Sequence, residues 1–160
     1  DLGGCGLAAL PDDFGERLPS LRKLNAAKNA LSSLPASFAG LLQLRIAFFL
    51  GCDFETVPSV LGRLPRLFML SFKANKLSAI PEDALSPSIG WLILSDNRLE
   101  RLPASIGRLG GLRKCMLAGN RLTELPAEMG RCRDLELIRL ADNRLREMPT
   151  YVSLYVHFII

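Results

Sequence analysis

The segment "LILSDNRLERLP" at residues 92–103 recurs along the chain with its apolar letters in the same places. Similar segments are "LSFKANKLSAIP" at 70–81 and "CMLAGNRLTELP" at 115–126. A unit of this size cannot bury its own apolar side chains, so neighbouring copies must stack and share one core. The recurrence therefore predicts a stacked-repeat fold.

The asparagine in each segment sets the period. Its copies lie 22 or 23 residues apart, at Asn75, Asn97, Asn120 and Asn143. Asn29 lies two periods before Asn75, and Cys52 occupies the place between them. The pattern L-x-x-L-x-L-x-x-N-x-L-x-x-L-P begins in six windows, at Leu21, Leu44, Leu67, Ile89, Leu112 and Leu135, after a partial window over residues 1–20.

The L-x-L part of each window alternates between inward and outward side chains, as a strand requires. We therefore expect one parallel sheet with strands near residues 23–27, 46–50, 69–73, 91–95, 114–118 and 137–141. Proline after the last leucine ends each strand segment, and the chain should return along the convex side as short helical or irregular structure. The third window is one residue shorter and contains Pro87, so its return arm should be irregular.

Five asparagines are expected to form a structural ladder at the strand ends: Asn29, Asn75, Asn97, Asn120 and Asn143. An inward amide can both donate and accept hydrogen bonds, so it can satisfy backbone groups where the chain turns. Cys52 can do this only weakly, so we expect a local loosening at that rung.

This pattern resembles the leucine-rich repeat family in its 23-residue Leu-Pro form, over residues 1–152. The wording "SFKANKL", "ALSPSIGWLILSDN", "LRKCMLAGNRL" and "CRDLELIRLADNRL" is similar to the repeat region of bacterial-type leucine-rich-repeat protein kinases. The resemblance implies an α/β repeat fold, a right-handed solenoid with a curved parallel sheet on its concave side. In that family a kinase domain follows the repeats, but this sequence contains no Gly-rich nucleotide loop, H-R-D loop or D-F-G motif.

The outward strand positions define a predicted partner-binding face. Repeat positions three, five and seven should line the concave side, and their middle is apolar in this sequence. Adjacent strands lie about 4.8 Å apart, so these side chains should form one contiguous patch. The face residues are Ile46, Phe48, Leu50, Met69, Trp91, Ile93 and Met116. Trp91 is the expected anchor; the alternative is that these side chains lean on one another or are covered by a neighbouring domain.

Two further sets of residues receive structural interpretations. Repeat position ten forms a cationic row, which we expect to be a solvated face offset by Glu100, Glu124 and Glu147: Lys76, Arg98, Arg121 and Arg144. The four cysteines fall at repeat positions that should point inward, as buried and unreactive thiols: Cys5, Cys52, Cys115 and Cys132.

Composition limits the other possibilities. The chain has 160 residues, 49% of them hydrophobic, and a net charge of +4, which is too mild to imply nucleic acid. No apolar run reaches the roughly 18–20 residues of a membrane helix, and the opening "DLGGCGLAAL" does not resemble a signal peptide. Widely spaced cysteines form neither a disulfide nor a zinc framework. We expect a reducing, cytoplasmic location, with no cofactor, metal, nucleic acid or membrane partner.

Residues 153–160 form an apolar tail after the last window, where a solenoid needs a polar cap. Three explanations remain: a cut from a longer protein, an error in the gene model, or an extra strand, and the first two together are favoured. In function, the sequence favours a non-catalytic module that binds a protein or peptide on its concave face. The alternative is the regulatory or substrate-recruiting region of a protein kinase whose catalytic domain is absent, with that domain as a partner in cis. No nucleophile, acid–base pair or metal cluster supports an enzyme.

Overall fold

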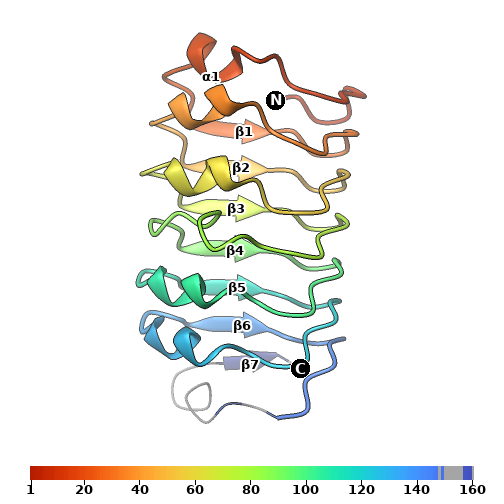
Figure 1. Ribbon diagram of the computed structural model, residues 1–160, viewed down its shortest axis with the longest axis vertical. Helices are drawn as coiled ribbons and strands as arrows, with labels where there is room; N and C mark the ends of the chain where they lie inside the picture. The colour runs from red at the N-terminus through yellow and green to blue at the C-terminus, as the bar shows by residue number, and fades with distance from the viewer. Residues whose placement is uncertain (148, 150–156, 160) are drawn as a thin grey trace.

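The computed structural model describes residues 1–147, 149 and 157–159. Its backbone winds through successive turns that each contribute one short strand to a single parallel sheet (Figure 1). The strands follow one another in chain order across the sheet: β1 Lys23–Asn25, β2 Ile46–Phe48, β3 Met69–Ser71, β4 Trp91–Ile93, β5 Lys114–Met116, β6 Leu137–Arg139 and β7 His157–Ile159. The predicted repeat fold with a parallel sheet is confirmed.

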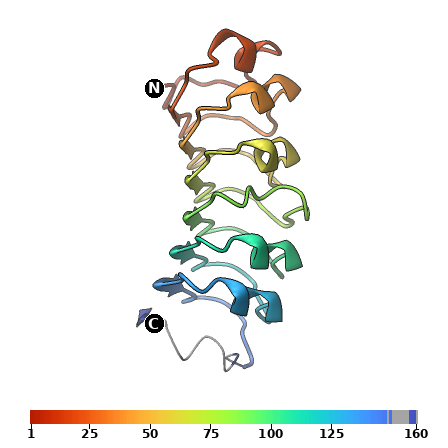
Figure 2. The same cartoon turned by 90° about the vertical axis from the view of Figure 1, so that its left-hand side faces the viewer.

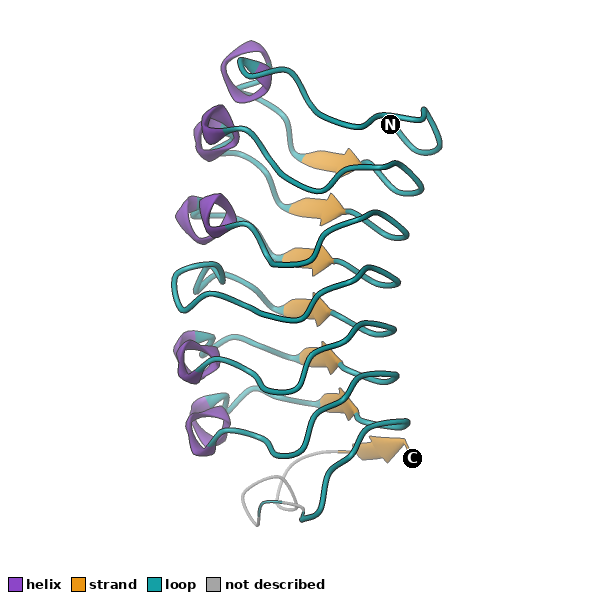
Figure 3. Ribbon diagram, turned by 45° about the vertical axis from the view of Figure 1, so that its right-hand side comes forward, coloured by secondary structure: helices purple, strands orange, loops and turns teal. Residues whose placement is uncertain are grey.

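Short helices cover the side opposite the sheet. They are α1 Phe14–Arg17 and the 3-10 helices η1 Ala36–Gly40, η2 Ser59–Arg63, η3 Ala104–Arg108 and η4 Ala127–Arg131. Figure 2 shows the sheet along one side of the stack and the helical arms along the other, with both ends leaning toward the sheet. The sheet therefore lines the concave side. Between β3 and β4 the arm contains turns but no helix (Figure 3), as the shorter window with Pro87 predicts.

The six predicted strands begin at the expected residues but are two residues shorter than predicted. Backbone hydrogen bonds nevertheless continue past each strand, as from Leu94 N to Met116 O at 2.8 Å and from Asp96 N to Ala118 O at 2.8 Å. The inter-repeat ladder thus extends over the predicted lengths, although its last bonds join residues that already bend away from the strand.

The two ends of the sheet are both extended by neighbouring chain. At the amino end, Leu2 N donates to Asn25 O at 2.7 Å and Gly4 N to Ala27 O at 2.8 Å, so the partial first window continues the ladder. At the other end, β7 pairs in parallel with β6. The sheet therefore includes three residues of the predicted apolar tail, as the extra-strand explanation expects, and the other two explanations stay predictions. The remaining tail residues, 153–156 and 160, lie outside the described residues.

The shared core is aliphatic along the whole stack and aromatic in its first half. Leu92 and Leu94 are fully buried, and their counterparts in the other windows are buried except Leu140, which is partly buried. Phe49, Phe54 and Phe72 form a cluster whose ring centroids lie 4.9–5.4 Å apart. The aromatic contacts continue outward from Phe49 through Phe38 to Phe14. Burial of such apolar surface is the main source of stability in this fold.

The asparagine ladder makes the hydrogen bonds that its position demands. The Asn97 amide nitrogen donates to the carbonyl oxygens of Phe72, Leu94 and Ser95 at 2.9, 2.9 and 3.2 Å. Its amide oxygen accepts from Leu77 N at 2.9 Å. The same four-bond arrangement recurs at Asn29, Asn75, Asn120 and Asn143. Each amide therefore ties its own turn to the preceding turn, which it contacts at two places.

Cys52 occupies the missing rung with weaker bonds. Its thiol donates to Ala26 O at 3.4 Å, in place of the three donations that an asparagine makes. Burial raises the pKa of the Cys52 thiol, while hydrogen bonds from the backbone at Asn29 and Leu31 partly oppose that rise. Strands β1, β2 and β3 keep their register across this rung. The local loosening expected here stays a prediction.

The other cysteines differ in their exposure. Cys115 and Cys132 are buried as predicted, and burial raises the pKa of Cys115 far above its usual range and that of Cys132 to about 11. Both thiols therefore stay protonated and unreactive. The prediction for Cys5 is wrong, because this thiol is exposed. Cys5 lies in the partial first window between Gly4 and Gly6, both with positive φ, and no earlier described turn packs over it.

Glu82 links the irregular arm to the next helix. Its carboxylate accepts hydrogen bonds from the backbone of Ala104 at 3.1 Å and Ser105 at 2.8 Å. These two N–H groups begin η3, where no partner within the helix is available to them. The backbone hydrogen bond from Ser105 is the main reason that the pKa of Glu82 lies below its usual range.

The residue before each ladder position adopts a left-handed backbone conformation, which the sequence analysis did not identify. The φ angles of this row lie between 55° and 69°: Lys28, Gly51, Ala74, Asp96, Gly119 and Asp142. Side chains with a Cβ adopt this conformation at a cost of roughly 1–2 kcal/mol. Glycine is therefore the best residue at these positions, with asparagine and aspartate next.

Replacing Ala74 with glycine should stabilise the protein. Ala74 has φ of 55°, and relief of its left-handed strain should exceed the entropy that glycine adds to the unfolded chain, for a net gain of about 0.5–1 kcal/mol. Gly51→Ala, at the same place in the preceding repeat (φ of 63°), is the reciprocal control and should destabilise by a similar amount. Urea unfolding of both variants tests this prediction. If the free energy of unfolding rose in both variants or fell in both, the explanation would be contradicted.

Candidate partner-binding face

Strands β2 to β5 bring the predicted face residues together. Across the sheet, the register places Met69 between Ile46 and Trp91 in one row, and Ile93 beside Met116 in the next. Every member of the predicted face is half-buried: Ile46, Phe48, Leu50, Met69, Trp91, Ile93 and Met116. Along each strand these side chains alternate with fully buried core residues. The structure therefore has the predicted inward and outward positions.

One residue of the face rows is covered by its neighbours. Ser71 lies between Phe48 and Ile93 in the register and is only 6% exposed. Because Ser71 is small and both neighbours are large, their side chains close over it. The apolar surface therefore continues from β2 to β4 across a polar position.

A cation lies against the expected anchor. The Lys114 ammonium nitrogen is 4.0 Å from the centroid of the Trp91 ring, a cation–π contact between adjacent strands β4 and β5. This contact orients the indole and covers part of its face. A partner that packs on Trp91 therefore meets an aromatic surface and a positive charge together.

The concave rows carry only positive charge. Repeat positions three, five and seven of the six windows include four cations, Lys23, Lys73, Lys114 and Arg139, and contain no aspartate or glutamate. Within the described part of the chain, Lys73 alone among these four forms a salt bridge, with Asp96 at 3.5 Å. The strands thus present an apolar centre with cations around it.

A pocket at the strand-start edge of the face was missed by the sequence analysis. It has a volume of about 420 Å³, opens to solvent and is lined by Arg22, Lys23, Arg45, Ile46 and Phe68. The Phe68 side chain is 43% exposed, although repeat position two is charged in most of the other windows. A large apolar residue in a row that is charged in four of the other five windows was the available signal.

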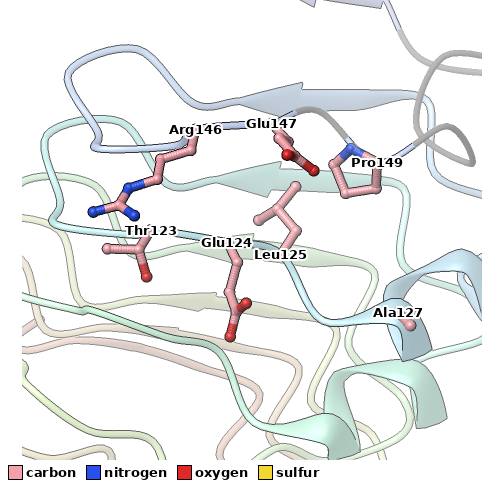
Figure 4. Close-up of a pocket in the computed structure, with 7 residues that line it drawn as sticks. All are labelled: Thr123, Glu124, Leu125, Ala127, Arg146, Glu147 and Pro149. Carbon is pink, nitrogen blue, oxygen red and sulfur yellow. The ribbon is translucent and has the colours of Figure 1, made fainter.

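Two other hollows lie on a different flank. Figure 4 shows one between neighbouring turns, lined by Thr123, Glu124, Leu125, Ala127, Arg146, Glu147 and Pro149. Equivalent repeat positions around Ile80 and Leu102 line the second hollow, one to two turns earlier. Because they recur with the repeat, these hollows follow from the stacking of the turns and do not single out one site.

The cationic row at repeat position ten is exposed, as expected for a solvated face. The expected pairing with glutamates is wrong, because no salt bridge joins the two sets within the described residues. Lys76 instead pairs with Asp53 in the preceding repeat at 2.7 Å. Lys76 and Asp53 lie on adjacent turns, close enough to pair. Each glutamate instead follows a cation of the row by two or three residues, on a segment that turns away from it.

Other kinds of site find no support among the described residues. No group of three or more potential ligands is placed to hold a metal ion in that part of the chain. Likewise, none of the helices described is long and apolar enough to cross a bilayer.

Comparisons with known proteins agree on the architecture. No family model matches the chain. A solved leucine-rich repeat protein of Leptospira interrogans superposes with a TM-score of 0.86 at 29% identity, covering 91% of this chain and 37% of that one. The leucine-rich repeat ectodomain of the Arabidopsis thaliana membrane receptor kinase GASSHO1/SCHENGEN3, solved in complex with Casparian strip integrity factor 2, gives 0.76 at 28% identity, covering 91% and 18%.

Among curated proteins, Gallus gallus keratocan is 37% identical over 101 residues, which are 60% of this chain and 28% of keratocan. The chain spans only 4–28% of the length of the first curated relatives that it matches. The similarity therefore concerns the repeats and not the remainder of those proteins.

Proposed function

Because this chain is a leucine-rich repeat protein, we propose that it is a non-catalytic interaction module whose concave face binds a protein or peptide. The observation that carries the proposal is the apolar face on β2 to β5. Its seven side chains remain partly in water, while the core beneath them is complete without them. Leu92, between Trp91 and Ile93 on the same strand, is fully buried.

The energetics support a binding role for these residues. Burying one large apolar side chain is worth roughly 1.5–3 kcal/mol. A partner that completed the burial of even the central members would gain several kcal/mol, which is typical of a binding surface. The Arabidopsis receptor ectodomain was solved with a bound factor, which supports a partner-binding role for a repeat array of this kind.

The expected result of replacing Trp91 and Ile93 with glutamate is loss of partner binding with little loss of folding. A phage library of random dodecapeptides selected on the native protein should yield enriched sequences, and these should fail to bind the double variant. The variant places charges in the centre of the apolar face, where a partner would have to desolvate them. Binding is measured by titration of a synthetic copy of each enriched peptide, and folding by thermal melting.

A matched control uses apolar residues that are exposed elsewhere. Leu18 and Leu42 are 41% and 52% exposed and lie outside the strands, so Leu18→Glu with Leu42→Glu makes the same chemical change off the face. This control should bind the selected peptides as the native protein does. Equal loss in both double variants, or a collapse of the melting temperature in the Trp91 and Ile93 variant alone, would refute the assignment.

The kinase alternative remains a second proposal. It is supported by the wording of the repeats and by the receptor kinase among the similar structures, whereas keratocan is not a kinase by name. Under this proposal the same concave face contacts a catalytic domain or its substrate. The coding sequence that follows residue 160 decides it, because kinase motifs there would support it and their absence from the complete gene would exclude it.

A cytoplasmic location is likewise a proposal. It is supported by four free cysteines in the described chain, since proteins of oxidising compartments usually pair such residues. Cell fractionation of the tagged protein tests it, and recovery from the secreted fraction would contradict it.

A further inference from the structure

The pocket at the strand-start edge of the face has a wall of three cations. Lys23 is the first residue of β1, and Arg22 and Arg45 directly precede β1 and β2. Backbone hydrogen bonds from Arg45 N to Arg22 O at 2.8 Å and from Phe68 N to Arg45 O at 2.9 Å place these residues on consecutive turns. Consecutive turns are about 4.8 Å apart, so the three positive charges lie close to one another.

These cations have no anionic partner within the described chain. No salt bridge or side-chain hydrogen bond involves Arg22, Lys23 or Arg45, whereas Arg113, in the same repeat position further along, pairs with Glu136 at 3.6 Å. Neighbouring unpaired cations repel one another, and an anion between them would relieve that repulsion. The pocket is therefore complementary to negative charge.

The opposite wall of the pocket is apolar. The Phe68 ring lies over the backbone of Gly90, where a Cβ would come within 2.2 Å of the ring carbon Cε2. Glycine at position 90 thus leaves room for the ring at the edge of the face. Ile46 belongs both to this pocket and to the apolar face, so the two surfaces are continuous.

We infer that this pocket binds the carboxylate side chains of an extended acidic peptide segment of the partner. The inference rests on the proposed function and deepens it by naming the chemistry of the partner. Carboxylates of the segment lie against Arg22, Lys23 and Arg45, and an apolar side chain beside them packs on Phe68 and Ile46. The segment then continues over the apolar face toward Trp91 and Lys114.

A peptide fits this surface better than a nucleic acid does. Nucleic acids need cations that follow a phosphate backbone, with open aromatic rings for the bases. Here three cations gather around one pocket, and Trp91, the ring at the centre of the face, is already in contact with Lys114. Alternating carboxylates and apolar side chains match this arrangement.

The test uses two measurements on the native chain. The peptides selected from the random library should be enriched in aspartate and glutamate next to an apolar residue. In addition, fluorescence anisotropy should show tighter binding of a labelled Glu-Glu-Leu repeat peptide than of its Gln-Gln-Leu and Lys-Lys-Leu counterparts, by about tenfold at about 0.15 M salt.

Charge reversal assigns the effect to the pocket. Arg22→Glu with Arg45→Glu should weaken binding of the Glu-Glu-Leu peptide by about tenfold or more. The matched control reverses the same number of charges on the other flank, through Arg98→Glu with Arg121→Glu, and should change binding less than about twofold. Phe68→Ala retains all the charges and should weaken binding by about three- to tenfold through loss of the apolar wall.

Each remaining outcome overturns the inference in a recognisable way. Equal losses in the two reversed variants would indicate general charge attraction, and tighter binding of labelled oligothymidylate than of the acidic peptide would indicate a nucleic-acid surface. Enriched peptides without acidic residues, still lost in the Trp91 and Ile93 variant, would overturn this inference while leaving the proposed function intact. Absence of any enriched peptide would overturn both.

Discussion

Replacing Asn97 with alanine should lower the free energy of unfolding by about 3–5 kcal/mol, because it leaves several buried backbone groups without a partner. The Asn97 side chain is 8% exposed and makes four hydrogen bonds, two within its own turn and two to the preceding turn. Alanine replaces none of them. The loss is a large share of the 5–15 kcal/mol typical of a whole domain.

The matched control is Asn25→Ala, the same chemical change on the concave surface. Asn25 is half-buried and bonds only to Asp1 and to the backbone of Ala27, both near solvent. Its replacement should cost less than about 1 kcal/mol. Urea denaturation followed by circular dichroism compares the two, and similar midpoints would show that the ladder is not a principal source of stability.

Replacing Phe72 with alanine should have an effect of the same size through packing. The Phe72 ring is fully buried, stacked on Phe49 at 5.0 Å and edge-on to Phe54 at 4.9 Å. Phe→Ala changes in cores cost about 3–5 kcal/mol through lost transfer energy and the cavity that remains. In a chain of this length the melting temperature should fall by about 6–20 °C.

Phe68→Ala provides the control for this second variant. Phe68 lies four residues earlier but is 43% exposed, so its removal should cost about 1 kcal/mol or less. Differential scanning calorimetry of both variants separates core packing from loss of an aromatic residue as such. A larger effect at Phe68 than at Phe72 would mean that the register of the third window has been assigned incorrectly.

The sequence was sufficient for those features that repeat. Each window predicts the first residue of its strand, since the alternation of Leu92, Ile93 and Leu94 admits only one inward face. The asparagine bonds follow for the same reason, because an inward amide at the end of a strand meets the same backbone groups in every turn. Pro87 and the missing residue of its window likewise predict the arm without a helix.

Features that depend on one place in the stack were not predictable in this way. Cys5 occupies an inward repeat position, but its thiol is exposed in a partial window where Gly4 and Gly6 both have positive φ. The Phe68 pocket needs Gly90 on the next turn and two arginines on previous turns, a combination that no single window contains. The residues with left-handed backbone, one before each ladder position, share no single residue type. Their mixture of glycine, aspartate, lysine and alanine gives no pattern that predicts this conformation.

The rung at Cys52 has a consequence for how such an array can grow. Its neighbours Phe49 and Phe54 belong to the aromatic cluster with Phe72, so the turn that lacks the asparagine bonds also lies within the aromatic packing. The aromatic side chains of that turn pack against those of the next turn. A copy of the turn placed elsewhere in the stack would lack these contacts. The windows that begin at Ile89 and Leu112 share the asparagine and a largely leucine core, so gene duplication can copy them in phase. The second half of the solenoid therefore holds the more interchangeable turns, whereas each turn of the aromatic first half is fitted to its neighbours.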